Sequence, residues 1–253
     1  MVNWLGFRTL LFKEIRRFLK VWSQTLLAPC VQALIFLVIF TVAIGRSLGP
    51  GGVTYAEFLV PGLIMLVVLQ NAFGNTSSSI MIAKVDGSIV DVLMPPLSPG
   101  ELTFAYALGG AARGVAVAIL AGLAMAIFVD VRILHPGFVI FHAIAAATTL
   151  SLVGIIVGIW AQKFDHMAAT NHFIITPLTL ISGSFYSVDR LTGYWHTLAL
   201  LNPVFYLIDG FRYGFIGVSD APVWIGVVLM LAVNALLILA AYQMFRTGYR
   251  LKA

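Results

Sequence analysis

The sequence has 253 residues, of which 60% are hydrophobic and only 10% are charged, and its mean hydropathy is +1.00. A soluble domain has about a quarter of its residues charged, so the composition excludes that class and indicates an integral membrane protein. The formal net charge is +5 at pH 7, but the basic residues flank apolar segments and form no single stripe, which argues against a nucleic-acid partner.

Residues 4 to 22 carry a helical pattern in which large apolar residues recur at steps of three and four. These residues are Trp4, Phe7, Leu11, Ile15, Phe18 and Trp22, and the basic residues Lys13, Arg16, Arg17 and Lys20 occupy other positions of the helical wheel. The pattern predicts an interfacial helix within residues 1–24, with its aromatic side toward the lipid and its basic side toward anionic headgroups. An amphipathic helix packed on a partner domain is the alternative. No small-residue cleavage site follows, so we expect no cleavable signal peptide.

Six apolar segments are long enough to cross a membrane, since about 20 residues at 1.5 Å each span roughly 30 Å of hydrocarbon. They cover approximately residues 25–45, 58–80, 102–129, 137–161, 167–187 and 222–245. With the N-terminus inside, ten Lys and Arg residues lie on the cytoplasmic side and four, Arg46, Arg132, Arg190 and Arg212, lie outside. Because cytoplasmic loops carry the excess of Lys and Arg, the bias predicts that both termini are cytoplasmic.

The cytoplasmic connection over residues 84–101 contains a predicted short helix from Ser88 to Leu93, which Met94-Pro95-Pro96 ends. A short helix with exposed apolar residues and rigid prolines is suited to enter a groove on a partner and transmit its motion. An ordinary cytoplasmic loop is the alternative. The candidate coupling residues are Asp86, Gly87, Ser88, Ile89, Asp91, Leu93, Pro95 and Pro96.

The fifth apolar segment breaks at Ser182-Gly183-Ser184, and an aromatic-rich stretch over residues 187–221 follows. Backbone groups freed at membrane depth must be buried in protein or face a water-filled cavity. We therefore predict a re-entrant external hairpin of two half-helices hinged at Asn202-Pro203. Phe185, Tyr186, Asn202 and Pro203 are candidates for an exit gate, and an interfacial aromatic belt is the alternative for the two aromatic residues.

Polar residues within the spans are candidates for a substrate pathway, with interhelical hydrogen bonds as the alternative. Arg113 lies deep in the third span with no carboxylate at comparable depth. We expect helix-end carbonyls, an anionic lipid or a negatively charged substrate group as its partner, and a packed arginine that joins spans is the alternative. Gly110-x-x-x-Gly114 and Gly154-x-x-x-Gly158 permit close helix packing. The candidates are Asn71, Asn75, Ser78, Arg113, Asn171, Thr179 and Ser182.

The sequence contains no pattern typical of catalysis. Paired carboxylates, a nucleophile with its base and a cluster of metal ligands are all absent, and no Gly-x-x-x-x-Gly-Lys-Ser/Thr phosphate loop occurs. The single cysteine, Cys30, lies in an apolar run and is interpreted as a packing residue. We therefore expect no catalytic residue, no metal site and no cofactor bound by this chain.

Together these features resemble the ABC-2 family of ATP-binding-cassette transporter permeases, in particular small bacterial six-span members grouped with lipo-oligosaccharide and drug exporters. The most specific similarity covers Thr176-Pro177-Leu178, Ser182 to Val188, Leu201-Asn202-Pro203, Gly210 to Gly214, and Phe58 to Leu63. Members often carry a proline soon after the position of Asp189, where this chain has Arg190-Leu191-Thr192-Gly193.

The resemblance implies one all-α membrane domain over residues 1–253 in the bacterial inner membrane. It also implies a homodimer with two copies of a separate ATPase subunit, which binds ATP and Mg. Such a permease, with membrane lipid as a further partner, is expected to move an amphipathic or lipid-linked molecule, such as a glycolipid, a polysaccharide or a drug, outward. An ion-coupled secondary transporter is the alternative, but that class places ionisable groups near the midplane, and apart from Arg113 the predicted spans have none.

Overall fold

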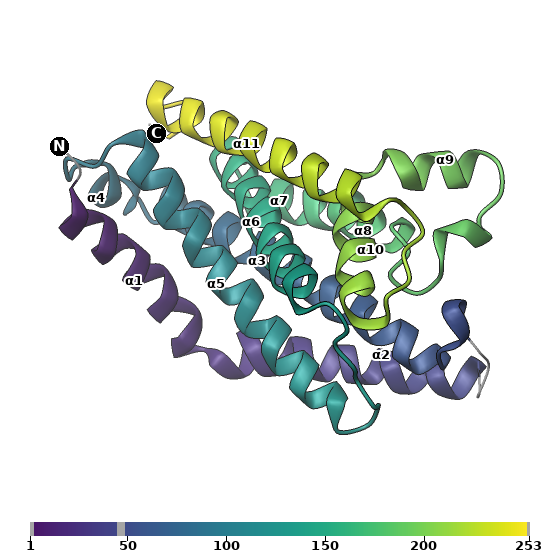
Figure 1. Ribbon diagram of the computed structural model, residues 1–253. Coiled ribbons are helices and arrows are strands. Elements are labelled where there is room, and N and C mark those ends of the chain that lie inside the picture. Colours follow the sequence, from purple (N-terminus) through teal and green to yellow (C-terminus); the bar gives the residue numbers. More distant parts are fainter. Residues whose placement is uncertain (1–2, 45–48, 252–253) are drawn as a thin grey trace.

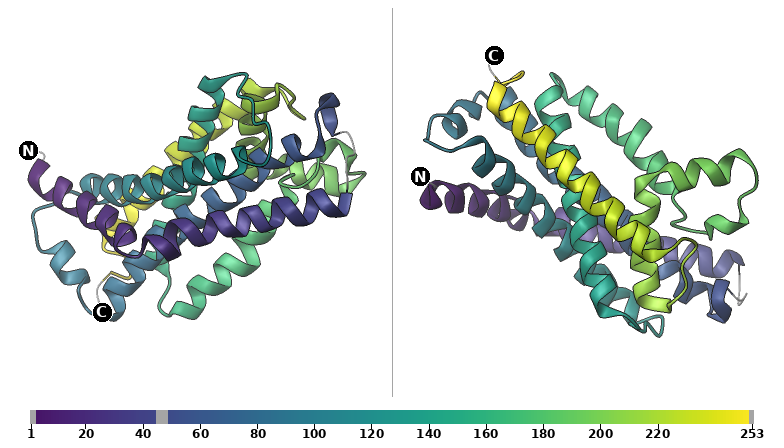
Figure 2. Two further views of the ribbon diagram at one scale, coloured as in Figure 1. Left: turned by 90° about the horizontal axis from the view of Figure 1, so that it is seen from below. Right: turned by 45° about the horizontal axis from the view of Figure 1, so that its top comes forward.

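The structure is a computed structural model that describes residues 3–44 and 49–251, and within these ranges its regular elements are all helices (Figure 1). Two residues used in the charge analysis, Arg46 and Lys252, lie outside the described ranges. The N-terminal end of the first helix and the C-terminal end of the last helix lie at the same end of the molecule, which agrees in both views of Figure 2.

Five helices are long and apolar enough to cross a membrane. They are α2 (Ala28–Ile44) with the π-helical turn Ser23–Leu27 before it, α3 (Tyr55–Val85), α5 (Pro99–Ala126), α6 (Pro136–Trp160) and α11 (Val223–Thr247). They coincide with five of the six predicted segments. Residues 167–187, the remaining segment, form a succession of short helical pieces, α7 (Phe164–Thr170), a π-helical turn (Asn171–Ile175) and α8 (Thr176–Ile181). A sixth crossing therefore stays a prediction.

The remaining helices flank the spans. α1 (Trp4–Lys20) precedes them, and α4 (Ile89–Leu93) lies in the connection between α3 and α5. The stretch predicted as a hairpin forms a 3-10 turn (Val188–Arg190), α9 (Tyr194–Leu201) and α10 (Pro203–Ile216), with Asn202 between the two helices. α9 and α10 lie away from the chain ends (Figures 1 and 2).

Local sequence explains where the long helices begin and end. Thr54 and Glu57 form a capping box at the start of α3, and Ser98 and Glu101 form another at the start of α5. Each box satisfies two backbone N–H groups that the first helical turn leaves unpaired. At the C-terminal end of α6, the Lys84 ammonium donates to the carbonyls of Ile159 (2.7 Å) and Ala161 (2.5 Å).

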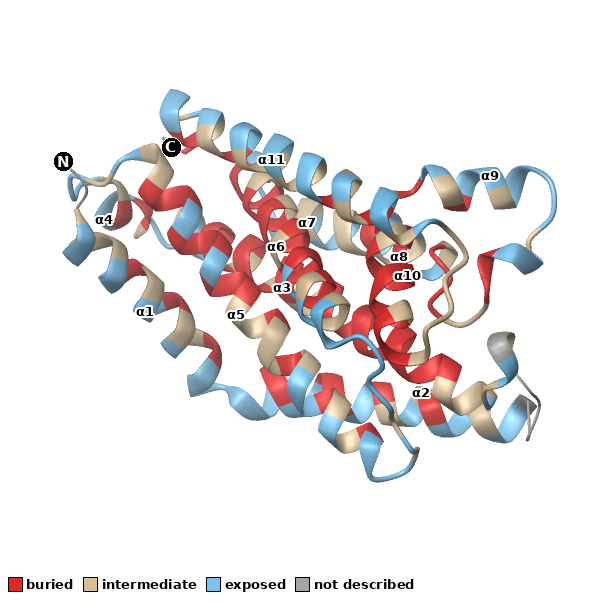
Figure 3. Cartoon of the chain, viewed as in Figure 1, coloured by how far each residue is buried: buried red, intermediate tan, exposed pale blue. Residues whose placement is uncertain are grey.

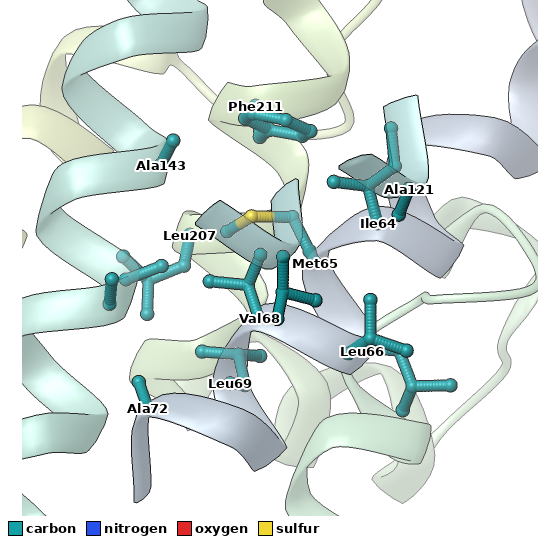
Figure 4. Packing of buried hydrophobic residues seen from close by; sticks show 14 of the residues in the cluster. Ile64, Met65, Leu66, Val68, Leu69, Ala72, Ala121, Ala143, Leu207 and Phe211 are labelled. Atoms are coloured by element: carbon teal, nitrogen blue, oxygen red, sulfur yellow. The ribbon is translucent and has the colours of Figure 1, made fainter. Parts of the chain in front are cut away.

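α3 is the central helix of the fold. Its residues from Phe58 to Leu69 are all buried, and its most extensive contacts are with α6 and α5. In Figure 3 buried residues are concentrated in α3, α6 and α10, whereas α1 and α11 carry exposed residues along their outer sides. Figure 4 shows Met65 and Val68 of α3 packed near Leu207 and Phe211 of α10. A helix that is apolar around its whole circumference is buried on all sides.

Glycines bring α5 and α6 close to α3. A Cβ atom on Gly154 would lie 2.2 Å from Thr76 Oγ1, and one on Gly110 would lie 2.7 Å from Thr76 Cγ2. Real Cβ atoms do not approach other atoms so closely, so only glycine fits at these crossings. The contact allows Thr76 Oγ1 to donate a 2.7 Å hydrogen bond to the Ser151 carbonyl across the α3–α6 interface.

Candidate functional site

The connection between α3 and α5 presents α4 at the same end of the molecule as the chain ends (Figure 1). Gly87 has a φ of +79°, a left-handed conformation that glycine adopts readily, and it turns the chain out of α3. Ile89 and Val92 are buried in a core cluster with Leu10 and Phe245. The opposite side of α4 is free, since Val90 is 54% exposed and Met94 is 76% exposed.

Most of the eight candidate coupling residues lie on the outer surface of this connection. Asp86, Gly87, Asp91, Pro95 and Pro96 are exposed, Ser88 and Leu93 are half-buried, and Ile89 is buried. Asp86 Oδ1 accepts hydrogen bonds from the Ser88 hydroxyl (2.7 Å) and the Ser88 N–H (3.0 Å). These bonds hold the pKa of Asp86 below its ordinary value, so the carboxylate stays ionised at neutral pH.

A cleft of about 600 Å³ separates α4 from α1. Lys13 and Thr9 line it from α1, and Asp91, Val92 and Pro95 line it from the α4 side. The cleft joins exposed apolar and charged groups in one concave surface, which is a shape that a protruding segment of a partner can fill.

The polar face of α3 contacts α1 through an ion pair that the sequence analysis missed. Glu14 is fully buried (0% exposed), and Ser79 Oγ donates to its Oε1 at 2.7 Å. Arg17 Nε lies 3.5 Å from Glu14 Oε2, and the guanidinium donates to Asn75 Oδ1 (3.1 Å) and Ser78 Oγ (3.2 Å). The prediction that Arg17 faces lipid headgroups is therefore wrong. The missed signal was the spacing of Leu10, Glu14 and Phe18, which places the carboxylate in line with two buried residues.

Arg113 has a protein partner that was not predicted. Its Nη2 donates to Asn71 Oδ1 at 2.6 Å, and the Asn71 amide in turn donates to the Val67 carbonyl at 2.8 Å. This partner is a side-chain amide of α3, whereas the prediction named helix-end carbonyls, an anionic lipid or a substrate group. The physical reason is the close crossing of α3 and α5, where a Cβ on Gly114 would lie 3.3 Å from Ala72. The packed-arginine alternative describes this contact.

The pathway candidates on α3 thus all contact arginines of neighbouring helices. Asn71 binds Arg113, and Asn75 and Ser78 bind Arg17. These are the interhelical hydrogen bonds that stood as the alternative reading. They also place two guanidinium groups beside one polar helix face.

The break after α8 is stabilised by side chains from both sides of it. Asn202 Nδ2 donates to the Ser182 hydroxyl (2.7 Å) and the Leu178 carbonyl (2.8 Å), and its Oδ1 accepts from the N–H of Val204 (3.0 Å). Ser184 Oγ donates to the Thr179 carbonyl at 2.8 Å. Asn202 therefore joins the end of α8 to the start of α10, where Pro203 is the first residue. Of the remaining pathway candidates, Asn171 lies in the π-helical turn of the same segment.

Arg212 lies in the core beneath this break. It is 2% exposed, donates to the Gly183 carbonyl, and its guanidinium carbon lies 4.0 Å from the centre of the Phe58 ring. The sequence analysis counted Arg212 as an external-loop residue, and its burial corrects that interpretation. Asp209, one turn earlier on α10, is also buried and accepts from the N–H of Asp220 (2.9 Å). The sequence signal for this was the spacing of Asp209 and Arg212, because residues three apart on a helix lie on the same face and can interact.

The two aromatic gate candidates differ in their contacts. The Phe185 ring lies 4.7 Å from the Phe40 ring and 5.9 Å from the Phe36 ring, so it packs on α2. Its carbonyl accepts a 2.8 Å hydrogen bond from the Tyr55 hydroxyl of α3. Tyr186 OH donates to the Ile181 carbonyl at 3.0 Å. Phe185 thus bridges two spans, whereas Tyr186 closes its own turn.

Comparison with known proteins decides the family. A family model described as ABC-2 type transporter matches residues 6–216. The chain belongs to the ABC-2 type transporter family. It is 38% identical over 220 residues to the inner membrane transport permease YadH of Escherichia coli strain K12, an alignment that covers 87% of this chain and 86% of the relative. It is 25% identical to nodulation protein J of Rhizobium leguminosarum bv. viciae, over 95% of this chain and 93% of that protein.

This ABC-2 permease is therefore a bacterial inner-membrane protein and the membrane subunit of an ABC transporter. Its relatives are transport subunits and not enzymes, and the family implies a separate ABC ATPase partner. Within residues 3–44 and 49–251, no three His, Cys, Asp or Glu side chains are grouped closely enough to hold a metal ion.

Proposed function

We propose that this permease moves an amphipathic or lipid-linked molecule, such as a glycolipid, a polysaccharide or a drug, outward across the inner membrane. In this proposal it acts as a homodimer with two copies of a separate ATPase, which binds ATP and Mg. The family supports the ATPase-driven class of transporter, and the observation that carries the proposal is the exposed outer side of α4. Val90 and Met94 are large apolar residues that remain open at the end of the molecule where the chain ends lie.

The anchoring of α4 supports its role as a coupling helix. Ile89 and Val92 pack into the cluster that also contains Leu10 of α1 and Phe245 of α11. A force applied to the outer side of α4 therefore reaches α1 and α11 together, because packed helices move as nearly rigid bodies. The Glu14–Arg17 contact with Ser79 and Asn75 carries the same displacement into α3.

The exit gate is proposed at Phe185, between α2 and the segment α7–α8. Its ring contacts Phe36 and Phe40 of α2, so separating α2 from α8 would open an apolar plug of the kind that gates by excluding water. Both termini are placed in the cytoplasm in this scheme, and α7–α8 forms the sixth crossing.

The decisive experiment measures which ATPase co-purifies with the permease. A tagged permease is purified from membranes of the cells that naturally produce it, and its partners are identified by mass spectrometry. The α4 variant Val90→Ser/Met94→Ser should lose the ATPase, because both changed side chains are exposed and not part of the core. The control Leu134→Ser removes an equally exposed apolar residue from the α5–α6 connection and should retain it.

Two results would contradict the proposal. One is an ATPase that binds the α4 variant as well as the wild type, and the other is a wild-type permease that captures no ATPase. Transport by the isolated permease that stops when the proton gradient is collapsed would instead favour the ion-coupled alternative, for which buried Glu14 would be the first residue to test.

A further inference from the structure

Two cavities at the end of α5 farthest from the chain ends share a common wall. The first, of about 430 Å³, is almost entirely apolar and lies among α3, α5, α6 and α10. The second, of about 330 Å³, is lined by three charged residues, Glu57 near the start of α3 and Asp130 and Arg132 of the α5–α6 connection, together with apolar residues. Val131 and Phe215 line both cavities. Each volume lies within the range of about 300–1,000 Å³ that is usual for ligand sites.

The apolar cavity follows one face of α5 from its last turn toward the middle of the helix. Val115, Ala118, Gly122 and Ala126 line it at steps of three and four. From residue 115 to residue 126 the helix rises about 16 Å, which is about half of the roughly 30 Å hydrocarbon thickness. The cavity therefore has the depth of one leaflet and suits one extended acyl chain.

The opposite walls of this cavity are also apolar. Ile64 of α3, Ala143 of α6 and Phe211 of α10, three of the labelled residues in Figure 4, line it from three helices. Ile119 and Ile140 line it from α5 and α6 and are exposed on the surface of the bundle. In a bilayer this exposed side faces lipid, so an acyl chain can enter sideways without crossing the protein.

The polar cavity places opposite charges at the mouth of the apolar one. Arg132 Nη2 lies 3.0 Å from Asp130 Oδ2, with side chains that are 76% and 70% exposed. Glu57 Oε2 accepts from the Thr54 hydroxyl (2.9 Å) and the Thr54 N–H (2.7 Å), so the carboxylate is held in position at the start of α3. The mouth thus contains two carboxylates and one guanidinium.

We propose that the two cavities form one binding site for a phospholipid whose headgroup carries both a phosphate and an ammonium group. An acyl chain occupies the apolar cavity, the phosphate binds Arg132, and the ammonium lies between Glu57 and Asp130. The charges at the mouth favour one kind of headgroup. Arg132 can pair with a phosphate and the two carboxylates can pair with an ammonium, whereas a purely anionic headgroup would be repelled by the net negative charge of the mouth. The site lies apart from α4 and Phe185 and does not depend on the transport proposal.

The test counts lipids that remain bound to the purified permease. The protein is reconstituted in vesicles with equal amounts of phosphatidylethanolamine and phosphatidylglycerol, extracted in mild detergent, and examined by native mass spectrometry. The wild type should retain phosphatidylethanolamine several-fold over phosphatidylglycerol.

Gly122→Leu is designed to fill the apolar cavity without disturbing the helix. A Cβ on Gly122 would lie 3.6 Å from Ile64 Cδ1, which is an ordinary contact, and the rest of a leucine side chain would extend into the cavity that Gly122 lines. We expect this variant to retain several-fold less lipid than the wild type. Gly137→Leu is the matched control, because a Cβ there would meet no atom of another described segment within 4 Å, and it should bind lipid normally. If Gly122→Leu does not fold, Ile119→Trp blocks the cavity from its exposed side.

Asp130→Asn tests the headgroup separately, because it removes one of the two carboxylates that disfavour an anionic headgroup and leaves Arg132 in place. It should keep the acyl chain but reduce the preference for phosphatidylethanolamine toward equal binding of the two lipids. A wild-type protein that retains the two lipids equally, or a folded cavity-filling variant that retains as much lipid as the wild type, would overturn the proposal.

Discussion

Gly62 sits where the backbone of α3 passes the broken end of α8. A Cβ at this position would lie 2.0 Å from the carbonyl oxygen of Ser184, and a backbone oxygen cannot rotate away as a flexible side chain can. The sequence motif around Pro61-Gly62 marked this position by resemblance, but only the packing explains why glycine is needed there. The crossing fixes the distance between α3 and the segment after Ser182.

Gly62→Ala should therefore destabilise the permease. Overpacking of this kind costs about 1–3 kcal/mol, so the thermal unfolding midpoint in detergent should fall. The control is Gly74→Ala in the same helix, where the described atoms leave at least 4 Å of free space around a Cβ and alanine gains about 1 kcal/mol of helix propensity. Equal midpoints for the two variants would refute the steric explanation.

Arg212 stabilises the break after α8, because its guanidinium donates to the Gly183 carbonyl. Replacing it with leucine removes a donor to Gly183 and leaves Asp209 without its nearest buried cation. Removing one partner from a buried charged network typically costs about 3–5 kcal/mol. We expect Arg212→Leu to increase amide hydrogen exchange across residues 183–201, whereas Arg190→Gln, at an exposed arginine, should leave it unchanged. Exchange at the wild-type rate in Arg212→Leu would mean that the guanidinium does not stabilise the break.

At the scale of elements, α1 is attached to the bundle by charge as well as by apolar packing. A Cβ on Gly109 of α5 would lie 2.6 Å from Glu14 Cβ. The lack of a side chain at Gly109 therefore allows α1 to pack closely against α5. The pair of buried Glu14 and half-buried Arg17 then contacts three polar residues of α3, Asn75, Ser78 and Ser79.

A double-mutant cycle on this pair should show strong coupling. Glu14→Gln and Arg17→Gln should each destabilise the permease, and the double variant should be less destabilised than the sum, with a coupling energy of about 0.5–3 kcal/mol. Lys13→Gln, at an exposed neighbour, should be nearly neutral. Additive effects on the unfolding free energy would show that the two side chains act independently.

The elements differ in how far the sequence predicts them. Spans such as α6 and α11 were predictable, because hydrocarbon thickness sets their length and the lack of water enforces a helix. The inward turn of Arg17 and the Asn71 partner of Arg113 were not, because both depend on how closely α1 and α5 approach α3. Hydropathy predicts which segments enter the membrane, but it does not predict which side chains contact each other there.

At the scale of the whole molecule, the number of membrane crossings determines on which side of the membrane each connection lies. The five long helices and the position of both chain ends at one end of the molecule are compatible with a sixth crossing by α7–α8. A π-helical turn at Asn171–Ile175 separates α7 from α8, so neither α-helix is long enough to cross the membrane alone.

Single-cysteine labelling can determine this topology. In a Cys30→Ala background, which removes the one native thiol, Lys163→Cys and Tyr194→Cys flank the α7–α8 segment at exposed positions. A membrane-impermeant maleimide should label Tyr194→Cys in intact cells and Lys163→Cys only after permeabilisation. Asp91→Cys in α4 serves as the cytoplasmic reference. Labelling of both flanking positions from the same side would exclude the sixth crossing.

The burial of Arg212 against Phe58 has a consequence for how the protein is made. A buried arginine without contacts is costly, and the two groups that its guanidinium contacts, the Phe58 ring and the Gly183 carbonyl, precede it in the chain. The ribosome therefore synthesises the Phe58 ring and the Gly183 carbonyl before Arg212. When α10 leaves the insertion machinery, the groups that contact Arg212 are already in the membrane protein. In nascent chains that end before Phe211, the helices α2 to α8 should already be packed together. Docking of α9 and α10 then completes the fold.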